Sequence, residues 1–171
     1  MKVKKITFEQ TQSFPKFILD YISESPSLDP FYHRKVSIKN FKAQFIEKQK
    51  QVLNREVLVE VLNDQYKNSP FFLNMSPQIE SLLNNKTFTV ATGHQLCLFT
   101  GPLYFIYKIF STINLSEQLN ISYRDYHFVP VFWMASEDHD FNEVNHLNLF
   151  GDKLVWNQNR KGAVGDISTE S

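Results

Sequence analysis

The stretch TFTVATGHQLCLFTGPLYFIYKIF, residues 87–110, decides the fold of this chain. Its first residues, Thr87 to Ala91, are rich in β-branched side chains and lack strict alternation, which predicts a strand buried on both faces. A helix is expected from Pro102 to about Leu119, because proline suits the first helical position. A second apolar run, His127 to Met134, predicts another buried strand, paired only after Pro130, which has no N–H group. Together these elements predict a βαβ unit with parallel strands.

The residues before this unit predict a helical segment rich in aromatic side chains. Residues 1–40 combine turn signals with scattered phenylalanines, which indicates a segment that lies over a core. Apolar residues at helical spacing predict one long helix over residues 37–67. A shorter helix is expected from Ser76 or Pro77 to about Leu83, with Ser76 as its N-cap. We therefore expect residues 1–86 to pack as one segment on the core.

Residues 87–171 are interpreted as the first part of a Rossmann-like domain in the α/β class. After the second predicted strand, only His146 to Phe150 and Lys153 to Trp156 are strand-like. A parallel sheet is covered on both faces and usually has more strands than this chain supplies. The sequence therefore predicts the front part of a larger protein, with the domain truncated at its end.

Composition argues against several classes of partner. Lys and Arg number 18, and Asp and Glu also number 18, so no net positive charge attracts nucleic acid or an anionic membrane. The single cysteine, Cys97, excludes an intrachain disulfide framework and a zinc site with several cysteines. The first residues, MKVKKITFEQ, lack the apolar core of a signal peptide. We expect a protein of the cytoplasm that binds neither nucleic acid nor membrane.

Two segments follow the predicted strands and are expected at one edge of the sheet, where open α/β sheets bind their ligands. The first is Thr92-Gly93-His94-Gln95, and the second is the acidic run that begins at Glu137. The predicted helix at Pro102 directs free N–H groups toward the same edge, and Gly101 allows a ligand to approach closely. His94 is a candidate for binding a phosphate oxygen or for transferring a proton. Equally plausible from the pattern are two turn glycines and a histidine bonded to loop backbone.

The acidic run EDHDFNEVNH, residues 137–146, has several readings. Glu137, Asp138 or Asp140 could bind an ammonium or hydroxyl groups of a substrate. His139, Glu143 and His146 could share a helical face and bind a metal, but the spacing is not that of H-E-x-x-H and such runs are more often solvated loops. We therefore predict no metal site. Outside the run, Cys97 is predicted to be buried without a base nearby, and Phe132 and Trp133 to be core residues.

The run ATGHQLCLFTGPLYFIYKI, followed a helix later by VPVFWMASEDHDFNEVNH, resembles the N-terminal part of the bacillithiol biosynthesis cysteine-adding enzymes, the BshC family. The resemblance implies a Rossmann-like core akin to the nucleotidyl-transferase domain of class I aminoacyl-tRNA synthetases. It also implies a chain several times longer than this one, whose missing part includes a coiled coil that forms a homodimer.

The resemblance implies a ligase that joins cysteine to the amine of glucosaminyl-malate in the last step of bacillithiol synthesis, with ATP and Mg²⁺ as cofactors. His94, Asp138 and His139 are then the expected catalytic residues. Substrate or nucleotide binding is expected of Thr92, Gly93, Gln95, Gly101, Pro102, Glu137 and Asp140. The present chain alone is expected to be inactive, because it holds part of the site. A metal-dependent hydrolase built on the acidic run, or a fragment that binds a ligand without chemistry, are the alternatives.

Overall fold

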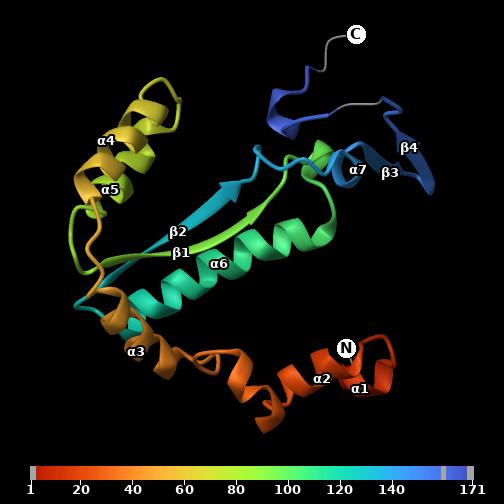
Figure 1. Ribbon diagram of the computed structural model, residues 1–171, viewed down its shortest axis with the longest axis horizontal. Helices are drawn as coiled ribbons and strands as arrows, with labels where there is room; N and C mark the ends of the chain where they lie inside the picture. The colour runs from red at the N-terminus through yellow and green to blue at the C-terminus, as the bar shows by residue number, and fades with distance from the viewer. Residues whose placement is uncertain (1–2, 159–160, 169–171) are drawn as a thin grey trace. The chain divides into compact units, whose positions relative to one another are not determined.

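The computed structural model describes residues 3–158 and 161–168, and it divides the chain into two compact units, Met1–Lys50 and Gln51–Ser171. Each unit has its own local architecture (Figure 1). The division of the chain at residue 86, expected from the sequence, stays a prediction. None of the helices among the described residues is both long enough and apolar enough to cross a membrane.

The first unit consists of short helices joined by turns. It contains α1 (Phe8–Thr11), α2 (Lys16–Ile22), the 3₁₀ helix η1 (Pro26–Phe31) and α3 (Ile38–Lys48). Thr7 and Gln10 form a capping box at α1, and Ser37 caps α3 by accepting from the N–H of Asn40. Arg34 bonds to Glu47 of α3 at 2.5 Å, which fastens the preceding turn to that helix.

The single helix predicted over residues 37–67 is wrong. The chain leaves the helical path after α3 and begins α4 (Arg55–Tyr66) afresh, with the side chain of Asn54 accepting from the N–H of Val57. An asparagine side chain that bonds to a backbone N–H favours a new helix start over continuation of the preceding helix. The apolar spacing of seven residues continues across this break, so the spacing alone did not predict it. Helix α5 (Phe72–Ser81) also begins earlier than predicted, so Pro77 lies inside it and Ser76 is not its N-cap.

The predicted βαβ unit is confirmed. It consists of β1 (Thr87–His94), α6 (Leu103–Ser122) and β2 (His127–Met134), with the two strands parallel and α6 alongside them (Figure 1). Pairing runs over the full length of β2, with Pro130 opposite Val90, so the expectation that pairing begins after the proline is wrong. On one edge of β2, Asn120 bonds to both the N–H and the carbonyl of Phe128, at 2.8 and 2.9 Å.

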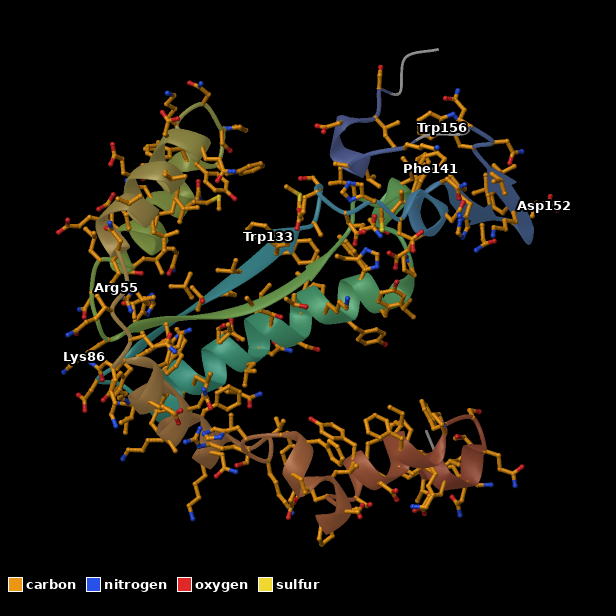
Figure 2. All side chains as sticks on the ribbon, viewed as in Figure 1. Arg55, Lys86, Trp133, Phe141, Asp152 and Trp156 are labelled. Carbon is orange, nitrogen blue, oxygen red and sulfur yellow. The ribbon has the colours of Figure 1, made fainter. Side chains whose placement is uncertain are left out.

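The core of the second unit lies where α4 and α5 meet the sheet. Val59, Ile79, Leu82 and Val129 are buried together there. Arg55, labelled in Figure 2, donates to the carbonyls of Leu82 at 2.7 Å and Thr87 at 3.1 Å, and so joins the start of α4 to the end of α5 and the start of β1. These bonds give two backbone carbonyls a charged donor.

The sheet is less buried than the sequence predicts. Thr89 and Ala91 of β1 are exposed, and Trp133 of β2 is 60% exposed on the face opposite α6 (Figure 2). Phe132, one position earlier, packs on Phe105 of α6 with ring centroids 5.0 Å apart. The prediction that Trp133 is a core residue is wrong, because alternate residues of a strand point to opposite faces and α6 covers one of them.

A small antiparallel hairpin follows the βαβ unit. The short helix α7 (Phe141–Val144) leads into β3 (His146–Leu149) and β4 (Asp152–Val155), close to the two strands predicted for this region. Phe141 packs edge-on against Trp156, with ring centroids 5.3 Å apart, and so joins the two ends of the hairpin region. Both residues are labelled in Figure 2. The 3₁₀ helix η3 (Val164–Asp166) returns to the start of the acidic run, where Val164 donates to the carbonyl of Asp138 at 2.7 Å.

Candidate functional site

The carboxyl ends of β1 and β2 meet as predicted. His94 is paired with Met134 at the last position of the ladder, and the N–H of Ala135 then donates to the carbonyl of His94 at 3.0 Å. The acidic run therefore starts beside the segment that contains His94. This places both candidate segments at one edge of the sheet, the edge where open α/β proteins bind ligands.

The two glycines of this region have structural causes. A Cβ atom on Gly93 would lie 2.8 Å from the carbonyl oxygen of Trp133 on the neighbouring strand. Gly101 has φ +62°, and a Cβ atom there would lie 2.6 Å from the Cβ of Cys97. Both positions therefore need glycine so that the backbone can pass close to its neighbours. Their roles in ligand binding stay predictions.

His94 is the centre of the site. This residue is 8% exposed. Its ring centroid lies 5.3 Å from that of Tyr104 and 5.6 Å from that of Phe105, both on α6. Nδ1 lies 3.0 Å from the carbonyl oxygen of Gln95, and Nε2 lies 2.7 Å from the hydroxyl of Tyr104. A carbonyl only accepts, so Nδ1 carries the proton, and in the neutral ring Nε2 accepts from the Tyr104 hydroxyl.

Glu143 approaches His94 from the short helix α7. Its Oε1 lies 3.6 Å from Nε2 of His94, and its Oε2 accepts a short hydrogen bond from the side-chain amide of Gln95. Gln95 is 3% exposed, and its buried Oε1 has no protein partner among the described residues. The carboxylate of Asp140 accepts from the N–H of Glu143 at 3.2 Å. Asp140 therefore caps α7 and holds the backbone of Glu143 in place.

Two acidic protons close to His94 are held more tightly than usual. Partial burial raises the pKa of the Cys97 thiol, and the charge of Glu143 raises it further, while Lys108 opposes the shift. Partial burial and Glu143 likewise raise the pKa of Tyr104. Cys97 and Tyr104 therefore stay protonated near neutral pH, which favours Tyr104 as a hydrogen-bond donor and disfavours Cys97 as a thiolate nucleophile.

Lys108 holds α6 against the end of β1. Its Nζ donates to the carbonyl of Gly93 at 3.0 Å and lies 5.4 Å from the centre of the Tyr104 ring. The bond joins the second turn of α6 to the residue before His94. Lys108 thus fixes the spacing between the strand that carries His94 and the helix that carries Tyr104.

The acidic residues predicted as catalytic or binding groups have other partners. Asp138 accepts from the backbone N–H groups of His139 and Asp140, at 2.6 and 3.2 Å, and Asp140 caps α7. Glu137 accepts from the indole of Trp133 at 2.9 Å. His139 is exposed, outside the hydrogen bonds that join His94 to its neighbours. Of this run, the structure brings Glu143 to His94, and the roles predicted for the other acidic residues stay predictions.

A cavity of about 710 Å³ opens beside this group. Gly101, Pro102 and Tyr104 at the start of α6 line one side, as the sequence predicted for the helix terminus, and β3 lines another. Its lining also includes Cys97, Leu98, Phe99, Glu143, Val144, His146, Leu147, Asn148, Leu149 and Leu154. A volume of this size lies within the ordinary range of small-molecule sites.

Sequence reasoning missed three features of this site. Tyr104 was not singled out, although it lies two residues after Pro102 and ten residues after His94. Glu143 was considered only as a metal ligand. The contact between Cys97 and His94 was also missed, since the sulfur lies 3.4 Å from Nδ1; this nitrogen carries a proton, so it is not a base toward the thiol. The spacing of three residues between His94 and Cys97 was the available signal.

The described residues do not favour the metal-hydrolase alternative. Within residues 3–158 and 161–168, no group of three or more His, Cys, Asp or Glu side chains is arranged to hold a metal ion. The described lining of the cavity carries the carboxylate of Glu143 and neither lysine nor arginine, although the start of α6 and His146 also line it. ATP and Mg²⁺ as cofactors stay a prediction.

Comparisons with known proteins agree on one family. The family model described as "Bacillithiol biosynthesis BshC, N-terminal Rossmann-like domain" matches residues 1–171. A protein of Flavobacterium psychrophilum named "Putative cysteine ligase BshC" is 50% identical over 97% of this chain and 32% of its own length. The protein of the same name from Christiangramia forsetii is 50% identical over 99% of this chain and 33% of its own length.

A more distant relative of the same name, from Bacillus licheniformis, is 33% identical over 85% of this chain and 27% of its own length. The chain thus spans about a third of the length of the relatives that cover nearly all of it. The parallel βαβ unit agrees with the Rossmann-like description of the matching model. The chain therefore belongs to the BshC family of bacillithiol biosynthesis, and it corresponds to the family's N-terminal Rossmann-like domain.

Proposed function

We propose that the whole protein is a ligase that forms an amide bond between the carboxyl group of cysteine and the amine of glucosaminyl-malate, and that this chain supplies the part of the active site around His94. The observation that carries the proposal is the buried His94 ring, bonded to Tyr104 and facing Glu143 beside a cavity of about 710 Å³. Family membership supplies the class of reaction, since the relatives are named as cysteine ligases.

The chemistry needs a group that takes a proton. An amine exists as an ammonium near neutral pH, and it must lose a proton before its lone pair can attack a carboxyl carbon. Nε2 of His94 accepts from the Tyr104 hydroxyl. The Tyr104 oxygen can therefore take a proton from the ammonium as it gives its own hydroxyl proton to Nε2. The carboxylate of Glu143 lies 3.6 Å from Nε2 and stabilises the imidazolium that results.

Activation of the cysteine carboxyl group is assigned to the whole protein. ATP with Mg²⁺ is the proposed activator, and we place it outside the part of the cavity beside Glu143, whose negative charge repels phosphates. We also propose that the whole protein acts in the cytoplasm as a homodimer. The proton transfer proposed for His94 and Tyr104 depends neither on the compartment nor on the homodimer.

The test is a histidine substitution in the full-length protein. His94→Gln is expected to lower the rate of thiol product formation by at least about a hundredfold, the ordinary contribution of a general base. His127→Gln is the matched control, because His127 lies at the opposite end of the sheet and bonds to Gln78 at 3.0 Å. A His94→Gln protein with wild-type turnover contradicts the proposal. So does robust product from the 171-residue chain alone with ATP and both substrates.

A further inference from the structure

We propose that the cavity beside His94 binds the ammonium group of the amine substrate, and that Glu143 is the residue that recognises it. The inference rests on the proposed function, and it assigns one substrate to one carboxylate. Nothing in the names of the relatives says which residue holds which substrate.

The position of Glu143 is fixed on three sides. Its backbone N–H donates to Asp140, Oε2 accepts from the amide of Gln95, and Oε1 lies 3.6 Å from His94. Its side chain is nevertheless 43% exposed, and the residue lines the cavity. A carboxylate held in one orientation and still open to a cavity is prepared to accept a hydrogen bond from a ligand.

The charge of Glu143 is not neutralised by a permanent cation. Among the described residues its ion-pair partner is His94, a side chain that carries a charge only when it is protonated, unlike lysine or arginine. Lys108, the cation that affects Cys97, donates to the carbonyl of Gly93. The field of Glu143 reaches both groups beside it, since it raises the pKa of Cys97 and of Tyr104. A cationic ligand would supply the missing charge.

The rest of the cavity suits an organic cation better than an anion. Apolar side chains such as Leu98, Leu149 and Leu154 form much of its described lining, and apolar surroundings strengthen the attraction between Glu143 and a positive charge. Phe99 and Tyr104 add aromatic rings, which attract ammonium groups. The carboxylate groups of a malate moiety would be repelled by Glu143. We therefore place the amino-sugar end of glucosaminyl-malate in the cavity and its malate end outside.

Steady-state kinetics of the full-length protein test the assignment. Glu143→Gln keeps an oxygen that can accept from Gln95 and removes the charge. We expect the KM for glucosaminyl-malate to rise about ten- to hundredfold, since hydrogen bonds to charged groups are the stronger ones, and the KM for cysteine to stay within about twofold. Glu117→Gln, an exposed position on α6, is the control. An unchanged KM for the amine substrate, or a rise in the KM for cysteine alone, overturns the assignment.

A binding experiment separates this inference from the proposed function. Ligand-observed NMR with the full-length protein compares D-glucosamine, a cation, with N-acetyl-D-glucosamine, its neutral analogue. We expect D-glucosamine to bind at least about tenfold more tightly, and Glu143→Gln to abolish the difference. If the amine binds in this way but the protein makes no thiol product, the ligase proposal fails and the ammonium site stands. If the protein is an active ligase that does not distinguish the two sugars, the ammonium site fails alone.

Discussion

The hydroxyl group of Tyr104 donates to Nε2 of His94 across 2.7 Å, and this bond joins the first turn of α6 to the end of β1. Because Nδ1 of His94 faces the carbonyl of Gln95, both ring nitrogens have partners and the ring has one orientation. Tyr104 and Glu143 are the side chains next to Nε2, so their substitution tests the proton transfer that we propose for His94.

Removal of the Tyr104 hydroxyl tests this arrangement. Tyr104→Phe keeps the ring that packs on His94 and leaves Nε2 without its donor. In the full-length protein we expect kcat to fall about ten- to hundredfold, as for loss of one positioned proton-transfer group, with less than about 1.5 kcal/mol lost in stability. Tyr107→Phe, an exposed position on the same helix, serves as the control. Equal kcat values for the two variants would contradict a role for the hydroxyl.

The close approach of the strands at Gly93 gives a prediction about stability. Gly93→Ala places a Cβ atom 2.8 Å from the carbonyl oxygen of Trp133, a backbone atom that cannot move without disturbing the β1–β2 ladder. We expect the variant to lose about 1–3 kcal/mol of stability, the usual cost of overpacking. Thermal unfolding of the full-length protein measures the change. Ala91→Ser adds one atom at an exposed position of the same strand and should shift the midpoint by much less.

Much of the fold could be predicted from the sequence, because local signals and packing agree there. The β-branched run at Thr87 and the apolar run at His127 gave the two strands of the βαβ unit, and Pro102 marked the start of α6. The break before α4 could not be predicted from apolar spacing, since it depends on the Asn54 cap. Trp133 was misplaced because its exposure depends on which face α6 covers, a tertiary property.

The site was partly predictable. The strand ends predicted that the segment with His94 and the acidic run meet at one edge of the sheet, as they do, while the roles of these residues stay predictions. The partners of His94 could not be chosen from sequence, because Tyr104 reaches it across a helix start and Glu143 through the turn of α7. The many acidic residues near Asp138 predicted substrate-binding side chains. In the structure Asp138 accepts from backbone N–H groups. Aspartate commonly binds backbone in this way, and composition alone does not distinguish the two roles.

The raised pKa of Cys97 gives a prediction about thiol reactivity. Only the thiolate reacts with iodoacetamide, so at pH 8 the labelling of Cys97 in the folded protein should be slower than in the urea-unfolded protein. Glu143→Gln removes a negative charge that disfavours the thiolate, which lowers the pKa and should speed labelling at the same pH. Mass spectrometry of the peptide that contains Cys97 measures both rates. Faster labelling in the folded wild type, or no acceleration in the variant, would contradict the electrostatic account.

The two roles available to Asp140, helix cap and charged substrate ligand, predict different outcomes for one pair of variants. Its Oδ1 accepts from the N–H of Glu143 at 3.2 Å, and asparagine caps helices about as well as aspartate. If capping is its role, Asp140→Asn keeps both stability and activity. Asp140→Ala then loses about 1 kcal/mol, typical of a lost N-cap, and raises the KM for the amine substrate because Glu143 is no longer held in place. If the charge of Asp140 binds substrate instead, Asp140→Asn should impair turnover as strongly as Asp140→Ala. Thermal unfolding and steady-state kinetics of the two full-length variants decide between the roles, and the geometry of α7 favours the cap.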